Sequence, residues 1–274
     1  MNQSLIGGIL DPRGPVAANE YQILQNATLV MLALIVPIIV LTLVFAWWFR
    51  AGNQRATRRP DWEYSGPLEV VNWMVPLMII LFLGGMGWVA THALDPARPL
   101  PADTPPVEIQ VVSLDWKWLF IYPDAGVAAV NHLVVPAGRP LHLRLTSGTV
   151  MNSFFVPQLG SQIYTMAGMT TTLYLQADRP GTFPGRSFQY SGAGFSDMRF
   201  AVDAVTASDY DAWLERTRAG AARLDAAGYA ALARPGTSAP RDYRLAEPRL
   251  FHTILAAATA PAPSPTHESR SHVR

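Results

Sequence analysis

The chain has 274 residues, half of them hydrophobic and only 15% charged, whereas about 25% of residues are charged in a typical soluble domain, so membrane segments are indicated. A formal net charge of +1 gives no basic excess that would neutralise the phosphates of a nucleic acid. The sequence contains no cysteine, which excludes disulfides, zinc–thiolate sites, iron–sulfur clusters and cysteine nucleophiles.

Two long stretches without Asp, Glu, Lys or Arg predict transmembrane helices over residues 27–49 and 70–94. At 1.5 Å per residue the first is about 34 Å long, enough to cross a hydrocarbon layer of about 30 Å. Pro37 and Pro76 interrupt them, which membrane helices tolerate when neighbours satisfy the freed carbonyl groups. The first stretch is too long for a signal-peptide core and follows no basic region, so we expect a retained anchor after a segment at 1–26.

Arginines predict the orientation of this hairpin. They cluster just after the first stretch, whereas the outer flanks carry one arginine each; the cluster is Arg50, Arg55, Arg58 and Arg59, and the flanking residues are Arg13 and Arg98. Because Lys and Arg accumulate on the cytoplasmic side, the loop 50–69 is predicted to be cytoplasmic. Both termini and the main domain would then lie in the periplasm of a Gram-negative cell.

The remainder of the chain predicts an outer β-domain. A proline-rich linker covers 95–106. Short aromatic and alternating stretches separated by turn residues then predict a β-sandwich over 107–206. Residues 207–255 have a helical pattern with Ser208 as the expected N-cap. The segment 256–274, rich in Pro and Ser, is expected to be disordered.

Three segments carry a family resemblance: "SLDWKWLFIYP", "VMNSFFVPQLGSQIYTMAGM" and "YSGAGFSDMRF". Together with the two N-terminal spans they resemble subunit II of haem–copper respiratory oxidases, in the quinol-oxidising, cytochrome bo-type branch. The likeness runs from about residue 10 to about residue 251. It implies a fold of two transmembrane helices followed by an all-β cupredoxin-like sandwich with a C-terminal helical extension.

The cytochrome c-oxidising branch of this family holds a dinuclear copper centre with two bridging cysteines, two histidines, one methionine and a glutamate carbonyl, because soft thiolates are needed to hold both copper ions. None of the six positions keeps its ligand type here; the corresponding residues are Asn152, Tyr190, Gly192, Gly194, Met198 and Ala201. The resemblance therefore implies a cupredoxin-like domain without this copper centre. With Gly192 in place of the glutamate, a magnesium ion at the boundary with subunit I also loses its ligand.

The resemblance implies subunit II of a proton-pumping ubiquinol oxidase with a structural and assembly role. Subunit I would hold haem b, haem o or a, and copper, and would oxidise ubiquinol, so we expect no cofactor and no catalytic residue in this chain. Expected partners are subunit I, subunits III and IV and membrane lipids, with neither nucleic acid nor cytochrome c, in the bacterial inner membrane. The alternative is a membrane-anchored periplasmic cupredoxin-like binding module outside any oxidase.

For several single residues, the sequence leaves both a functional and a structural interpretation open. Glu69 precedes "VVNWMVP", and in the family a glutamate there lies at the mouth of a proton-uptake channel; otherwise it is an interfacial carboxylate. In copper-bearing relatives a tryptophan near Trp116 and Trp118 lies on the electron route, but aromatic packing against a partner is the expectation here. His132 and His142 are expected on neighbouring strands, where they could face each other, and metal ligation by them is not expected.

Some members of this branch begin with a lipoprotein signal and a lipidated cysteine. Because this sequence contains no cysteine, no such anchor exists as written. Either the sequence starts short of such a segment, or the two helices anchor the chain by themselves.

Overall fold

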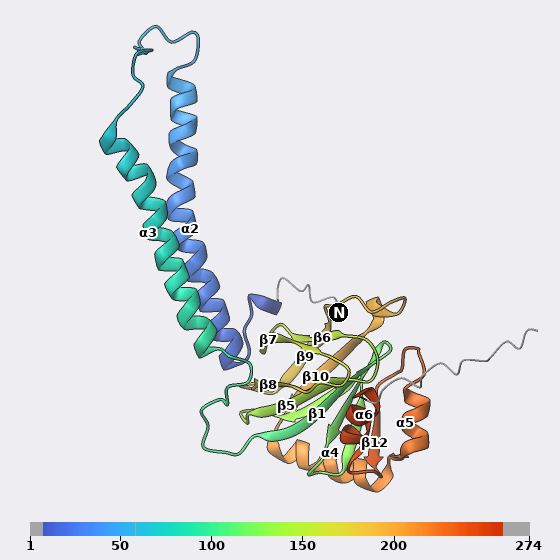
Figure 1. The fold of residues 1–274 in the computed structure, drawn as a ribbon. Coiled ribbons are helices and arrows are strands. Elements are labelled where there is room, and N and C mark those ends of the chain that lie inside the picture. The colour runs from blue at the N-terminus through green and yellow to red at the C-terminus, as the bar shows by residue number, and fades with distance from the viewer. Residues whose placement is uncertain (1–7, 58, 260–274) are drawn as a thin grey trace, which may run out of the picture.

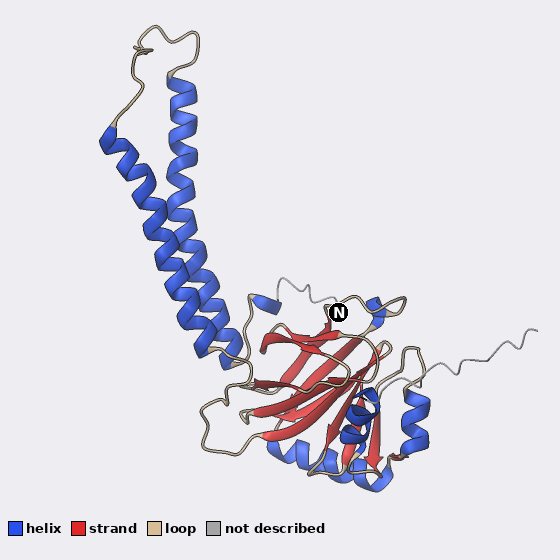
Figure 2. Ribbon diagram, in the orientation of Figure 1, coloured by secondary structure: helices blue, strands red, loops and turns tan. Residues whose placement is uncertain are grey.

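A computed structural model describes residues 8–57 and 59–259, and shows a long helical hairpin standing on a β-domain (Figures 1 and 2). The hairpin consists of α2 (Pro15–Trp48) and α3 (Gly66–Ala93), which continue through Pro37 and Pro76. Both are long and apolar enough to cross a membrane, and their most apolar windows are unburied in the isolated chain. Helix α2 begins well before residue 27, so the expected span is only its distal part.

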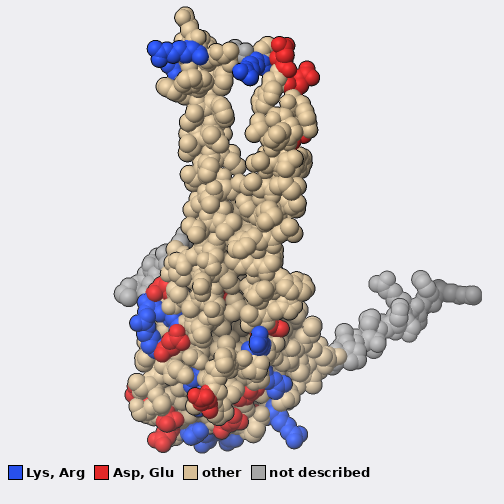
Figure 3. Space-filling view, turned by 90° about the vertical axis from the view of Figure 1, so that its left-hand side faces the viewer, with Lys and Arg blue, Asp and Glu red and all other residues tan. Residues whose placement is uncertain are grey.

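Charge is distributed as a membrane hairpin requires (Figure 3). Lys, Arg, Asp and Glu lie around the loop that joins the helices and over the β-domain, whereas the shafts between them show almost none. Charged side chains are costly within the hydrocarbon layer. The two charged ends therefore bracket the part of the hairpin that can lie in a bilayer.

The first turn of α2 belongs to the β-domain rather than to the membrane. Pro15 occupies the first helical turn, where its missing N–H costs nothing. Val16 and Ala17 are buried, and the Ala17 N–H donates to the Leu159 carbonyl at 3.3 Å. A side chain at Gly160 would collide with Val16. These contacts fix the base of the hairpin on the edge of the domain.

Two sheets form the domain, as the sequence predicts. The seven-stranded sheet has the order β11 (Ala222–Leu224), β12 (Arg241–Leu245), β3 (Val127–Val130), β2 (Lys117–Tyr122), β1 (Val107–Leu114), β5 (Leu141–Ser147) and β8 (Thr171–Leu175). The five-stranded sheet has the order β4 (His132–Pro136), β10 (Arg199–Val205), β9 (Gly181–Ser187), β6 (Asn152–Val156) and β7 (Gly160–Thr165). Most neighbours are antiparallel, but β1 pairs with β5 and β10 with β4 in parallel, and β11 with β12 likewise.

Aromatic rings fill the space between the sheets. Trp118 and Phe120 of β2 meet Phe200 of β10 at centroid distances of 5.5 and 5.4 Å. Phe154 of β6 stacks on Phe200 at 5.0 Å. All four rings are at most 5% exposed, and such clusters stabilise a core beyond their buried area alone. Trp118 is therefore a core residue.

In the C-terminal extension, α5 (Ala226–Leu232) and α6 (Leu250–Thr259) cover the outer face of the seven-stranded sheet, whereas α4 (Ala207–Gly220) packs Tyr210, Trp213 and Leu214 into the core between the sheets. The extension also contributes β11 and β12 to the seven-stranded sheet, which the helical pattern did not predict. The N-cap of α4 is Thr206 rather than Ser208, because its hydroxyl accepts the Asp209 N–H at 3.2 Å. Residues 260–274 of the expected tail, residues 1–7 and Arg58 lie outside the described residues.

A second core results from this cover. It joins side chains of the sheet to those of the extension: Val112, Leu114, Leu119, Ile121, Ala128, Val130, Leu224, Tyr243, Leu250, Phe251 and Ile254. Every residue of β2 is consequently buried, since alternate side chains enter the two cores.

Candidate functional site

The candidate site is the connection between β9 and β10, residues 189–198, which ends in a short 3-10 helix (Phe195–Asp197). In the resemblance to copper-bearing relatives, this connection is the copper loop. It lies on the side of the domain from which the hairpin projects (Figure 1).

Trp116 shapes this loop. It occupies the turn between β1 and β2 with a φ of 64°, which is uncommon for a residue other than glycine. Its indole N–H donates to the Ser191 carbonyl at 3.0 Å. A Cβ atom at Gly194 would lie 2.3 Å from the indole ring, and one at Gly192 would lie 3.4 Å away. The two glycines therefore leave room for the tryptophan, and a cysteine at 194 would collide with it.

Two of the other positions tie the loop to its neighbours. Asn152 is fully buried, accepts a hydrogen bond from the Ser187 hydroxyl at 3.2 Å and donates to the Val150 carbonyl at 3.1 Å. Met198 is 1% exposed, and its carbonyl accepts the Ser187 N–H at 3.2 Å. Tyr190 is instead 73% exposed, with its ring against Phe195. Ala201 lies further along β10, opposite Pro184.

This donor set does not fit a dinuclear copper centre. The chain has no cysteine, the amide of Asn152 is already hydrogen-bonded, and the thioether of Met198 is the one soft ligand among the six positions. In the described part of the chain, no three His, Asp or Glu residues are grouped so that they could hold a metal. The loop is thus largely packed: Asn152 and Met198 are buried, and Gly192 and Gly194 lie against the indole ring of Trp116, while Tyr190 is exposed.

His132 does not face His142, contrary to the expectation, because β4 and β5 belong to different sheets. Its ring Nε2 lies 2.6 Å from Asp203 Oδ2, and its Nδ1 lies 3.8 Å from Asp242 Oδ1. Asp242 also accepts the Trp213 indole N–H at 3.0 Å. The hydrogen bond with Asp203, and then the contact with Asp242, raise the pKa of His132 to about 9. Sequence spacing alone could not have found this cluster, because its members come from β4, β10, β12 and α4.

The other singled-out residues lie apart. His142 bonds to Glu108 at 2.5 Å and stacks on Tyr174 at 4.6 Å. Trp118 is fully buried, and its indole N–H has no hydrogen-bond partner within the described residues. Glu69 lies in the exposed first turn of α3, at the far end of the hairpin. It lines a hollow of about 380 Å³ with Glu63.

Two comparisons find similarity to the periplasmic domains of other proteins. The family model "Cytochrome C oxidase subunit II, periplasmic domain" matches residues 126–205, which include the loop. The periplasmic domain of subunit II of the cytochrome oxidase of Bradyrhizobium japonicum aligns with 42% of this chain and 94% of its own, at 23% identity and a TM-score of 0.40.

Relatives over most of the chain define the branch. "Cytochrome bo(3) ubiquinol oxidase subunit 2" of Pseudomonas putida is 48% identical over 90% of this chain and 79% of its own length. "Ubiquinol oxidase subunit 2" of Acetobacter aceti is 45% identical over 90% of this chain and 81% of its own length. The chain therefore belongs to the family of ubiquinol oxidase subunits 2, the subunits II of an oxidoreductase complex.

Proposed function

We propose that this chain is the non-catalytic subunit II of a proton-pumping haem–copper ubiquinol oxidase in the inner membrane of an aerobic bacterium. The main supporting observation is a loop whose copper-ligand positions in the resemblance hold a buried asparagine, a buried methionine and two glycines against an indole ring, in a chain whose relatives are named ubiquinol oxidase subunits. Haem b, haem o or a, copper and the ubiquinol site belong to subunit I in this proposal. Cytochrome c has no role, because the loop offers no electron acceptor.

An apolar surface supports the role as a brace for subunit I. Six large side chains around the loop are 38% to 73% exposed: Val150, Met151, Tyr164, Met169, Phe188 and Tyr190. Contiguous exposed apolar patches mark interaction sites on soluble domains. Both hairpin helices are also exposed along their apolar length. Subunit I covers this patch and part of the hairpin in the assembled complex, and subunits III and IV complete it.

The test is purification of the complex through an affinity tag on this chain, followed by a reduced-minus-oxidised spectrum. We expect two haems and one copper ion per complex, with ubiquinol oxidation and no oxidation of cytochrome c. A colourless particle would contradict the proposal and favour the second reading, a membrane-anchored binding module. Paired copper bound to this chain, with a purple colour, would contradict the absence of an electron-accepting site.

We propose that Glu69 assists proton uptake, because it lies in the first turn of α3 and lines a hollow next to the loop between the helices. Glu69→Gln should lower the turnover of the assembled oxidase about two- to tenfold. This is less than the roughly 10²–10⁴-fold contribution of a positioned catalytic acid or base, because bulk water supplies protons by other routes. Oxygen consumption across a pH series measures the effect.

The matched control is Glu63→Gln, which removes a second carboxyl group of the same hollow. It should leave turnover unchanged, and both variants should assemble with a full haem content. If Glu69→Gln had unchanged turnover at every pH, Glu69 would be only an interfacial carboxylate.

A further inference from the structure

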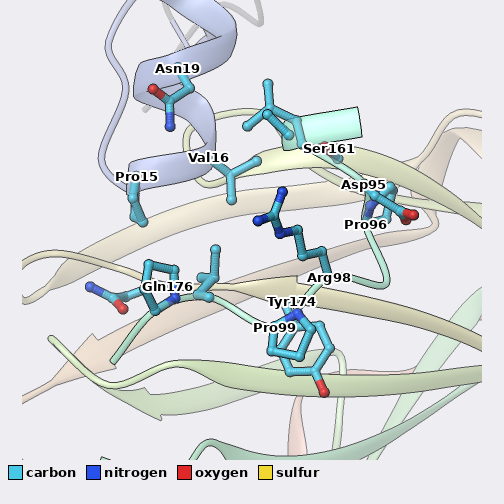
Figure 4. A pocket seen from close by; sticks show the side chains of 14 residues that line it. Pro15, Val16, Asn19, Asp95, Pro96, Arg98, Pro99, Ser161, Tyr174 and Gln176 are labelled. Atoms are coloured by element: carbon cyan, nitrogen blue, oxygen red, sulfur yellow. The ribbon is translucent and has the colours of Figure 1, made fainter. Parts of the chain in front are cut away.

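Two cavities adjoin where the hairpin meets the β-domain. One, of about 480 Å³, lies between the base of α2, the end of α3 and the linker (Figure 4). The other, of about 780 Å³, is a groove between α2 and α3. Asn19, Ala93 and Leu94 line both. The two therefore form one continuous space, running from the domain into the membrane part of the hairpin.

The cavity next to the β-domain is lined by one positive and one negative side chain, Arg98 and Asp95. Arg98 is exposed, and its guanidinium lies amid the labelled lining residues in Figure 4. Its side chain donates one long hydrogen bond, to the His92 carbonyl at 3.4 Å. Within the described residues no carboxylate lies within 4.0 Å of it. An uncompensated guanidinium beside a membrane surface suits a phosphate group, which Arg binds with paired hydrogen bonds.

Further from the β-domain than this charged pair, amide side chains line the groove. Asn19, Gln22 and Asn26 are spaced three and four residues apart on α2, which places them on one face of the helix. All three are exposed, and their side chains have no hydrogen-bond partner in the described part of the chain. Amides in this position can donate to ester carbonyl groups at the boundary of the hydrocarbon layer.

The part of the groove furthest from the β-domain is apolar, lined by Leu81, Phe82 and Met86. Nothing lies within 4 Å of the place where a side chain at Gly85 would begin. From Leu81 to Leu94 the groove extends about 20 Å along α3. That is more than half of a hydrocarbon layer of about 30 Å, so one acyl chain of one leaflet fits.

We propose that this space binds one phospholipid whose head group carries both a phosphate and an ammonium. The phosphate lies at Arg98, the ammonium on the side of Asp95, the ester carbonyls along the amides of α2, and one acyl chain in the groove beside Gly85. The graded sequence of charge, amide and apolar lining matches the parts of such a lipid in order. A quinone head group carries no charge and would leave Arg98 without an anion, and an anionic lipid would bring no cation to Asp95, whose Oδ1 accepts the Ala97 N–H at 2.9 Å.

Native mass spectrometry of the detergent-purified full-length chain tests this proposal, with phosphatidylethanolamine and phosphatidylglycerol added separately. Arg98→Gln removes the phosphate ligand, and Gly85→Leu fills the groove. Each should weaken retention of phosphatidylethanolamine about tenfold. Arg98→Gln removes a hydrogen bond to a charged group, which contributes about one such factor, and Gly85→Leu takes the space of the acyl chain. The matched controls are Arg59→Gln, in the opposite loop, and Gly84→Leu, which also meets no atom within 4 Å but does not line the groove.

Unchanged binding in Arg98→Gln, or equal losses in Gly84→Leu and Gly85→Leu, would overturn the proposal. Phosphatidylglycerol that bound as tightly as phosphatidylethanolamine would overturn the assigned head group. Displacement of the lipid by stoichiometric ubiquinone would assign the space to a quinone instead. Circular dichroism of each variant separates lost binding from lost folding. The outcome does not depend on the oxidase, because the chain is tested without subunit I.

Discussion

At the scale of single residues, the indole ring of Trp116 shapes the loop at residues 189–198. Trp116 lies where a side chain at Gly194 would have to be, and its N–H holds the Ser191 carbonyl. Restoring one ligand residue would therefore not restore a site. The sequence shows that the ligands are missing, but it does not show that the tryptophan has taken their space, because residues 116 and 194 are brought together only by the fold.

Gly194→Ala should destabilise the chain by about 1–3 kcal/mol, because the new methyl group would lie 2.3 Å from the partly buried indole ring of Trp116. Chemical unfolding followed by tryptophan fluorescence measures the change. Gly220→Ala is the control, since nothing lies within 4 Å of that position. Combining Gly194→Ala with Trp116→Ala should cost less than the two single changes added together. Additive costs would show that the collision is absent.

Because of His132, the stability of the domain should fall as the pH becomes alkaline. Its pKa of about 9 lies above the value of about 6.5 in an unfolded chain. The stabilisation is therefore fully present below about pH 6.5 and is lost as the pH rises through 9. Thermal unfolding between pH 6 and 10 should show this decline in the native chain and a flatter profile in His132→Gln. Equal slopes would contradict it.

Acid should weaken the same cluster through its carboxylates. The pKa of Asp203 is lowered, chiefly by its hydrogen bond with His132. Burial acts to raise the pKa of Asp242, but the contacts with His132 and Trp213 outweigh it and the net shift is downward. Both carboxylates therefore stabilise the fold above the unfolded-state pKa of about 3.9, and this contribution is lost as the pH falls below it.

At the scale of elements, the extension makes the seven-stranded sheet a buried layer. The alternation of β2 assigns Trp118 and Phe120 to the inner core and Leu119 and Ile121 to the outer one. The apolar run of β2 predicts a strand, but it does not indicate that both faces of this strand are covered. The helices of the extension were predictable from their periodicity. β11 and β12 were not, because β11 is three residues long and β12 has three charged residues among five.

Phe251 anchors α6 on the outer face and is fully buried. Phe251→Ala should destabilise the chain by about 3–5 kcal/mol, through the lost transfer free energy and the cavity left behind. His252→Ala, at the neighbouring exposed position, should change stability by less than about 0.5 kcal/mol. Urea unfolding of both variants measures the difference. A small effect of Phe251→Ala would mean that the extension is only loosely attached.

At the scale of the whole molecule, the hairpin is fixed to the sandwich by the first turn of α2. The uncharged stretches correctly predicted two long apolar helices. They did not predict that α2 begins inside the outer domain, because residues before 27 include polar side chains typical of a loop. The family's segments predicted the sandwich, whereas the cavities at the junction arise from the packing of distant segments and have no signature in the sequence.

The natural absence of cysteine allows a direct test of orientation. Single cysteines at Arg59, in the loop between the helices, and at Arg179, on the domain, can be labelled in intact cells with a membrane-impermeant maleimide. We expect labelling of Arg179→Cys only, since arginines mark the cytoplasmic loop. Both variants should be labelled after lysis. Labelling of Arg59→Cys in intact cells would reverse the orientation.

The position of β12 between β11 and β3 has a consequence for biosynthesis. Until residue 245 has been synthesised, β3 is an open sheet edge and the outer face of β2 has no cover. Such edges and faces are where nascent chains associate wrongly. The two membrane helices precede all of this in the chain. The domain therefore stays incomplete, although already tethered to the bilayer, until β12 has been synthesised. During this interval a chaperone would protect the open edge of β3 and the uncovered face of β2.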